Sequence, residues 1–292
     1  MSFAIVTDSL AGLPLNLIAQ KGLVVIPLSY YVNGTEHTCL APEGCDMVGF
    51  YQAMKQKAEV STSMIPPQRF TESLSPLLSS GLDVLFISAS SGISSSYQSA
   101  CIAAQQLMEA YPGRKIRVVD SLSSTLGEGI LVLRAFGMRE KGMSLDETAD
   151  AVLSLRLHIA HYFTVDDLFY IRRGGRISGA SALLGTMLHI KPMCKGDEHG
   201  HIVANGKVRG RAQSIKALAE KYDKLVRYPA DQTVFIAHGN CPQDAETLAE
   251  LVRRTNPPRE LIVLPFDPTN GSHAGPGSLG IFFEGDENAR LD

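Results

Sequence analysis

Short loops rich in hydroxyl side chains are the part of this sequence best suited to chemistry. They occupy residues 7–9, 62–63, 90–96 and 120–121, and most of them directly follow an apolar run. Hydroxyl groups and free backbone N–H groups at a helix start favour a negatively charged ligand, because the donors and the helix dipole both attract it. Simple helix capping would explain any one of these loops. Convergence of two or three of them would form an anion-binding pocket.

Residues 92–96, which read Gly-Ile-Ser-Ser-Ser, also come within one residue of the nucleophile elbow G-x-S-x-G of serine hydrolases. In that interpretation Ser94 is the nucleophile and His273 is its base. The last glycine of the motif is Ser96 here, although the elbow uses small glycines for close packing against its neighbours. A serine hydrolase of the lipase or esterase type is therefore the alternative function rather than the leading one.

Two glycine-containing segments suggest a nucleotide site but fail on context. Residues 275–280 satisfy G-x-G-x-x-G literally, yet the apolar residues 281–283 predict a strand, whereas a dinucleotide fingerprint opens a helix. Gly206 and Lys207 lack the spacing and the following Ser or Thr of a phosphate-binding P-loop. We therefore expect no ATP site in this chain.

The histidine and cysteine patterns predict neither a metal site nor a cofactor. The histidine pairs at 158 and 161 and at 199 and 201 have no Cys or carboxylate set at a known ligand spacing. The cysteines are odd in number and widely spaced, without a C-x-x-C pair. We expect them to be reduced and structurally inert. They are Cys39, Cys45, Cys101, Cys194 and Cys241.

The elements that must position these loops follow from hydrophobic periodicity. In the first half, apolar runs alternate with amphipathic stretches, which predicts a parallel α/β sheet with helices on both faces. In the second half, residues 195–200 predict a hairpin turn, and the order of predicted strands and helices indicates a smaller α+β domain. We expect a domain boundary near residue 158, giving domains 1–158 and 159–292. The predicted strands are 4–6, 23–28, 83–88, 116–119, 190–194, 202–208, 233–237, 261–264 and 280–283, and the predicted helices are 100–111, 144–157, 213–226 and 242–254.

Composition places the chain among ordinary globular proteins. Of its 292 residues 45% are hydrophobic and 20% are charged, and the formal net charge is -3. The apolar content excludes intrinsic disorder, and the apolar runs are too short for a membrane span. The first eight residues contain Asp8 and no basic leader before an apolar segment, so we expect a cytoplasmic protein.

Positive charge is concentrated in residues 172–227, which hold 12 Lys and Arg against 4 Asp and Glu. Solvated helix faces would explain this balance, and an anionic ligand or partner would explain it equally well. Nucleic acid is a weaker candidate, since the stretch has neither interleaved aromatic residues nor a recognisable reading motif.

Taken together, the loops resemble the DegV family of fatty-acid-binding proteins over essentially the whole chain. No single piece is specific, but the order and spacing of the pieces are. The resemblance implies an α/β domain and a smaller α+β domain that hold one long-chain fatty acid between them. It also implies a separate fatty acid kinase, to which the bound lipid is presented for acyl phosphate formation. The matching pieces are residues 5–9, 62–63, 91–100, 172–178 and 273–280.

The resemblance also assigns roles to individual residues. Donors to the carboxylate would be the hydroxyls of Thr62, Ser94 and Ser95, with Arg176 and His273 beside the head group. Several preorganised donors plus positive charge suit a carboxylate or an acyl phosphate. The acyl tail would lie against Met64, Ile65, Leu183, Leu184, Met187 and Leu188, for which core packing is the alternative. The partner kinase would face Arg172, Arg173, Arg209 and Arg211.

This chain departs from the usual family pattern next to the assigned donors. Met64 and Ile65 stand where the family usually has Gln and Pro, and Ser95 and Ser96 stand where it usually has Gly and Thr. The changes keep the donor hydroxyls. They are expected to alter the shape of the pocket, and with it the preferred acyl chain.

Overall fold

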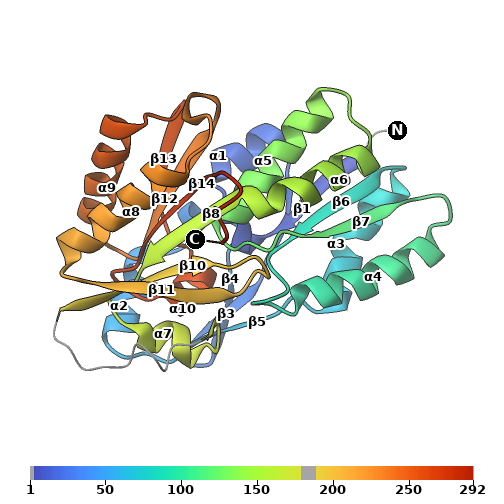
Figure 1. The fold of residues 1–292 in the computed structure, drawn as a ribbon. Helices are drawn as coiled ribbons and strands as arrows, with labels where there is room; N and C mark the ends of the chain where they lie inside the picture. Colours follow the sequence, from blue (N-terminus) through green and yellow to red (C-terminus); the bar gives the residue numbers. More distant parts are fainter. Residues whose placement is uncertain (1–2, 179–188, 292) are drawn as a thin grey trace.

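A parallel sheet lies at the centre of the first half of the chain (Figure 1). The computed structural model describes residues 3–178 and 189–291. The strands are apolar because helices cover both faces of the sheet, and every residue of β6 is buried. The predicted parallel α/β architecture is confirmed. In sheet order the strands are β2 (Val24–Ile26), β1 (Phe3–Asp8), β6 (Asp83–Ser88) and β7 (Ile116–Asp120).

Helices cover both faces of this sheet, and successive residues of each strand face opposite layers of helices. Ile5 and Leu85 face α5 and α6, whereas Val84 and Phe86 face α3 and α4. Ser144 and Glu147 form the capping box that the sequence predicts at the start of α6. The helices are α1 (Leu15–Lys21), α3 (Pro67–Ser79), α4 (Ser96–Ala110), α5 (Leu126–Glu140) and α6 (Leu145–Leu155).

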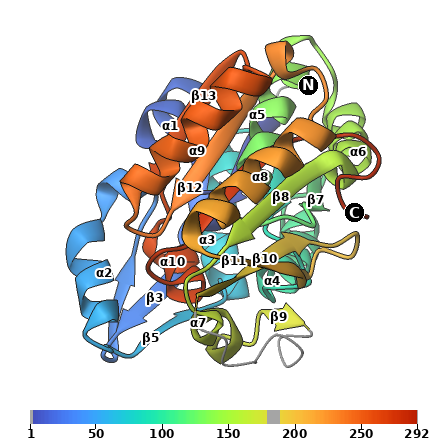
Figure 2. The same ribbon diagram turned by 60° about the vertical axis from the view of Figure 1, so that its left-hand side comes forward.

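A mixed sheet forms the second half of the chain, and α8 (Arg211–Leu225) and α9 (Pro242–Thr255) cover one of its faces (Figure 2). The opposite face presents Phe235 and Phe282 to the core around α5, so the two halves share one apolar cluster. A second sheet region is thus confirmed, while the boundary at residue 158 stays a prediction. The strand order is β13 (Glu260–Pro265), β12 (Thr233–His238), β14 (Leu279–Glu284), β8 (Ile159–Thr164), β10 (Ile190–Gly196), β11 (Ile202–Arg209) and β9 (Ile177–Ser178).

The hairpin predicted around residues 195–200 is present. Strands β10 and β11 pair antiparallel from Ile190 opposite Arg209 to Gly196 opposite Ile202, with an irregularity after Met193. The turn of this hairpin contacts the Ser90 loop of the first half, because the Ser90 hydroxyl donates a hydrogen bond to the carbonyl of Gly200. The hairpin therefore links the two sheets.

A small antiparallel sheet was not predicted from the sequence. It consists of β4 (Thr35–Thr38), β3 (Ser29–Val32) and β5 (Val60–Ser63), and α2 (Met47–Lys55) packs beside it. The interpretation of residues 62–63 as a loop was wrong, since Thr62 lies in β5 and pairs with Tyr30 of β3. The strands escaped prediction because they are polar, and β4 is exposed throughout.

Cys39 and Cys45 are joined by a disulfide, which corrects the expectation that all the cysteines are reduced. A short helical turn, Pro42–Gly44, folds the intervening chain back and brings the two Cα atoms to 6.2 Å. The spacing matches no recurrent cysteine motif, so only the folded turn reveals the pair. Cys101, Cys194 and Cys241 are free.

Two short helices from the second half of the chain lie beside the small sheet (Figure 2). They are α7 (Leu168–Arg173) and α10 (Pro268–Ala274), and they contact each other. Asp267 caps α10, because its carboxylate accepts the N–H groups of Thr269 and Asn270. No helix within the described residues is long and apolar enough to cross a membrane.

Candidate functional site

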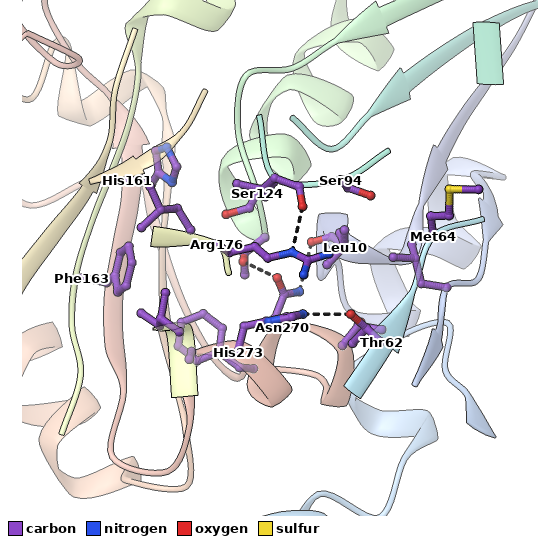
Figure 3. A pocket seen from close by; sticks show the side chains of 18 of the residues that line it. Leu10, Thr62, Met64, Ser94, Ser124, His161, Phe163, Arg176, Asn270 and His273 are labelled. Carbon is purple, nitrogen blue, oxygen red and sulfur yellow. Dashed lines mark hydrogen bonds between the residues drawn. The ribbon is translucent and has the colours of Figure 1, made fainter. Parts of the chain in front are cut away.

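A cavity of about 230 Å³ lies where the two halves of the chain meet (Figure 3). One side comes from the end of β5 and the loop before α4, and the opposite side from β8, β14 and α10. Two of the four predicted hydroxyl loops reach the cavity, namely residues 62–63 and 90–96. Thr62 and Ser94 are far apart in sequence, and the fold brings both to its lining.

The amino-terminal wall of the cavity, residues 62–64 and 93–95, is held by a local network of hydrogen bonds. The Ser94 hydroxyl donates to Ser96 Oγ at 3.0 Å, and the backbone N–H of Ile65 donates to the same oxygen at 3.0 Å. Ser96 thus ties the loop before α4 to the residues that follow β5. Ser95 lies at the N-cap of α4, where the helix dipole favours a negative ligand.

His273 on α10 reaches across the cavity to Thr62 (Figure 3). Its Nε2 lies 2.8 Å from Thr62 Oγ1, and its Nδ1 is buried without a hydrogen-bond partner among the described residues. Burial of the ring, followed by the positive charges of Arg176 and Arg173, lowers the pKa of His273 to about 4. The imidazole is therefore neutral near pH 7. It has a single N–H group, which can lie on the nitrogen that faces Thr62.

Arg176 brings a permanent positive charge to the cavity. Its Nε donates to the carbonyl of Ile93 at 3.2 Å, and its Nη1 donates to the carbonyl of Gly174. It is the only lining residue in the described part of the chain that is charged near pH 7. The guanidinium therefore bonds to the loop before α4 and favours an anionic ligand beside His273.

Gly174 and Gly175, which precede Arg176, each require glycine for a different structural reason. A Cβ at Gly174 would overlap with the imidazole of His273, so only glycine allows that close approach. Gly175 adopts a φ of +69°, in the left-handed region that glycine tolerates best. The segment from Arg173 to Arg176 thus shapes the turn that places both His273 and Arg176.

The side chains of Thr62, Ser94, Arg176 and His273 form what we call the polar cluster. Two buried carboxyl groups stabilise the chain around it. Asp8 accepts the N–H groups of Leu10 and Ala89 and so fixes the ends of β1 and β6. Its burial raises its pKa to about 6. Burial also raises the pKa of Asp267, whose side chain holds Asn270 in the cavity wall. Asp8 belongs to the loop at residues 7–9 that the sequence pointed to, whereas Asp267 was not predicted from the sequence.

The remaining wall is apolar and comes mainly from the second sheet. We call His161, Phe163, Ile202 and Phe282 the carboxyl-terminal wall. The sequence did not reveal His161 and Phe163 as lining residues. Their only signal is the two-residue alternation along β8, which every strand shares.

The predicted tail residues differ in placement. Met64 lines the cavity and is 45% exposed. Ile65 instead lies fully buried in the core cluster that contains Phe70 and Phe86, because the chain turns inward after β5. Leu183, Leu184, Met187 and Leu188 lie outside the described residues, so their assignment stays a prediction.

The arginines predicted to face a partner are not equivalent. Arg172 and Arg209 are exposed. Arg173 is also exposed, but it donates to the carbonyl of Val60 at 3.0 Å. Arg211 is part-buried and forms ion pairs with Asp244 at 2.9 Å and Asp166 at 3.6 Å.

The arrangement gives no support to the hydrolase alternative. Ser94 bonds to Ser96, whereas His273 bonds to Thr62, so Ser94 and His273 are not paired as nucleophile and base. In the same part of the chain, no cluster of three or more His, Cys, Asp or Glu residues could hold a metal ion.

Comparison with known proteins gives one family. The profile described as "Uncharacterised protein, DegV family COG1307" matches residues 2–286. A DegV domain-containing protein of Clostridium perfringens is 36% identical over 284 residues, covering 97% of this chain and 98% of the relative. A DegV domain-containing protein of Lactococcus lactis is 34% identical over 284 residues, covering 97% of each chain.

Solved structures agree in fold. A DegV family protein from Thermus thermophilus, described as binding fatty acid, superposes with a TM-score of 0.88 at 29% identity, covering 97% of this chain and all of that one. DegV of Bacillus subtilis, described as a fatty acid binding protein, gives 0.84 at 28% identity, covering 98% of this chain and all of the other. Family profile, relatives and fold coincide over nearly the whole length, and the chain therefore belongs to the DegV family.

Proposed function

We propose that this chain binds a single long-chain fatty acid in the cavity. The carboxylate would be held by Thr62, Ser94, Ser95, Arg176 and His273, with the tail against the apolar carboxyl-terminal wall. The observation that carries the proposal is the hydrogen bond between His273 and Thr62, beside Arg176, in a cavity whose lining surface is mainly apolar. Relatives described as fatty acid binding proteins support it.

The hydrogen bonds around Thr62 suit a carboxylate. If His273 Nε2–H donates to Thr62 Oγ1, the threonine hydroxyl is free to donate to the ligand. The Ser94 hydroxyl already donates to Ser96, so it must rotate to reach a ligand. Thr62 should therefore contribute more affinity than Ser94.

Burial of the acyl chain would supply most of the affinity. Each buried methylene contributes about 0.8 kcal/mol, so a chain of roughly 16 carbons gains about 12 kcal/mol before ordering costs. The polar cluster at residues 62 and 273 would then fix the orientation of the lipid. Affinity and orientation thus come from different parts of the site.

Direct binding measurements test this proposal. Delipidated protein should bind stearic acid, and Thr62→Val should weaken binding about tenfold and Ser94→Ala about threefold, since each loses one hydrogen bond. Thr247→Val and Ser154→Ala on exposed helix faces are matched controls and should bind like the wild type. Absence of stearic acid binding, or equal affinity of the Thr62→Val variant, would refute the placement.

We further propose that the chain acts as a carrier, without catalysing chemistry alone, and presents the carboxylate to a fatty acid kinase for acyl phosphate formation. The support is the family resemblance together with the exposed positions of Arg172, Arg176 and Arg209. A kinase active site needs the carboxylate near the protein surface, and Arg176 is both exposed and part of the cavity lining.

Charge reversal tests the carrier role. Arg209→Glu should slow acyl phosphate formation by a fatty acid kinase while fatty acid affinity stays unchanged, because interface charges act mainly on association. Arg254→Glu on the exposed face of α9 is the control and should leave the rate unchanged. Equal rates for both variants would remove Arg209 from the interface.

A further inference from the structure

His161 is a polar side chain in the apolar carboxyl-terminal wall. It lies on β8, where His161 and Phe163 face the cavity while Ala160 and Tyr162 face the core beneath α8. Only 3% of the residue is exposed, and its ring stacks against Phe282 with centroids 6.4 Å apart. Figure 3 shows it on the side of the cavity opposite Thr62 and Met64. The polar cluster does not include it.

The hydrogen bond between His161 and Arg290 fixes the tautomer of the imidazole. Arg290 Nη1 lies 2.8 Å from His161 Nε2. A guanidinium can only donate, so Nε2 accepts and the ring proton lies on Nδ1. Burial, and next the charge of Arg290, hold the pKa of His161 well below its usual value, which keeps the ring neutral.

Arg290 is itself held in place. It is 3% exposed, and its Nη2 donates to Ser123 Oγ at 2.6 Å and to the carbonyl of Arg156 at 3.2 Å. Its Nη1 also lies 3.3 Å from the carbonyl of Asp197. With Arg290 anchored to both halves of the chain, His161 has little freedom to exchange its tautomer.

The geometry leaves the Nδ1–H of His161 without a hydrogen-bond acceptor among the described residues, although the residue lines the cavity. A lipid that fills the cavity would displace water from this donor, and the donor would then be unsatisfied unless the lipid carries an acceptor. The fold also makes room for this ring, because a Cβ at Gly196 would overlap with the imidazole. A purely apolar wall would require neither the glycine nor the buried arginine.

We propose that His161 Nδ1–H donates a hydrogen bond to an oxygen carried on the acyl chain of the bound lipid. The inference rests on the proposed fatty acid binding and names the ligand class, namely hydroxy or keto fatty acids. His161 then determines specificity within the tail region, separately from the carboxylate donors. A saturated chain would leave the donor unsatisfied.

A ligand series tests this inference on the full-length protein. Delipidated wild type is titrated with stearic acid, oleic acid and hydroxystearic acids whose hydroxyl is moved along the chain, in competition with a fluorescent fatty acid. One positional isomer should bind about three- to tenfold more tightly than stearic acid, the gain of one neutral hydrogen bond. The dependence on hydroxyl position should show one maximum.

Variants assign that maximum to His161. His161→Phe should remove the preference, measured as the ratio of hydroxystearic acid affinity to stearic acid affinity within the same variant, since the ring volume is similar and the donor is lost. If the unpaired Arg290 prevents that variant from folding, the double change His161→Phe with Arg290→Met removes both polar groups. His161→Gln, which can still accept from Arg290, should shift or reduce the preference.

The outcomes separate this inference from the proposed function. No binding of any of the acids would refute the fatty acid site and the inference together. Binding of stearic acid with equal affinity for every hydroxystearic acid would overturn the inference alone. A preference for oleic acid only, or a hydroxyl preference that persists in His161→Phe, would also overturn it.

Discussion

The two walls of the cavity are built in different ways. The amino-terminal wall, residues 62–64 and 93–95, consists mainly of short hydroxyl side chains, on a strand end and a loop that bond to each other. The carboxyl-terminal wall consists mainly of rings on β8 and β14, together with Ile202 on β11, and β8 and β14 are held by neighbouring strands on both sides. The first wall suits the orientation of a polar group, and the second suits the fit of an apolar chain.

This difference predicts how each wall responds to mutation. In the amino-terminal wall, a hydroxyl such as that of Ser94 can rotate, so a lost hydrogen bond affects a ligand more than the fold. In the carboxyl-terminal wall, β8 pairs with both β14 and β10, so a change there disturbs the sheet. We expect stability effects to dominate on one side and affinity effects on the other.

The largest expected effect is that of Gly196→Ala in β10. The new Cβ would overlap with the ring of His161, which Arg290 prevents from moving aside. Overpacking of this kind costs about 3 kcal/mol in the free energy of unfolding, measured by urea denaturation. Gly137→Ala on α5 is the control, since its Cβ meets nothing within 4 Å and a helical alanine stabilises by about 0.5–1 kcal/mol. A loss as small as that gain would mean that the His161 ring moves freely.

The next effect is a pH dependence from His273 in the ligand-free protein. Its pKa is about 4 in the folded chain against 6.5 for the free side chain, so below pH 6.5 the unfolded chain binds a proton that the folded chain refuses. The stability from His273 is therefore lost as the pH falls toward 4. The shift corresponds to about 3 kcal/mol, reduced to about 2 kcal/mol because the ring is partly exposed.

Asp8 acts in the opposite direction over the same range. Its pKa rises from 3.8 to about 6, so the folded chain binds a proton that the unfolded chain does not, and stability increases on acidification. The pH dependence of wild-type stability therefore combines the opposing contributions of His273 and Asp8. The difference between wild type and His273→Gln isolates His273, and it should shrink by about 2 kcal/mol between pH 7 and pH 4. A constant difference would contradict the lowered pKa.

A third prediction concerns Gly174, which lies against His273. In Gly174→Ala the added Cβ should push the imidazole away from Thr62 and weaken fatty acid binding about tenfold. Gly175→Ala is the matched control. Its Cβ meets nothing within 4 Å, but its φ of +69° should cost about 1 kcal/mol of stability, and the affinity should fall less than in Gly174→Ala. Equal affinities for the two variants would contradict the role of Gly174.

How far the sequence predicts this molecule also differs between the two walls. Residues 90–96 follow an apolar strand, so their place at a sheet edge is visible in the pattern. The strand that holds Thr62 is polar and short, and only its pairing with β3 defines it. His161 looks like any inward strand residue, because its significance depends on Arg290, which lies 129 positions away. Local periodicity carries no information on such pairs.

The smallest effect is expected for Met64, the apolar member of the amino-terminal wall. Because Met64 is 45% exposed, Met64→Ala removes only part of a tail contact and should weaken fatty acid binding about two- to fourfold, measured by displacement of a fluorescent fatty acid. Met108→Ala on α4, 37% exposed and away from the cavity, should bind like the wild type. A loss as large as that of Thr62→Val would mean that this wall contributes fit as well as orientation, and the contrast between the walls would fail.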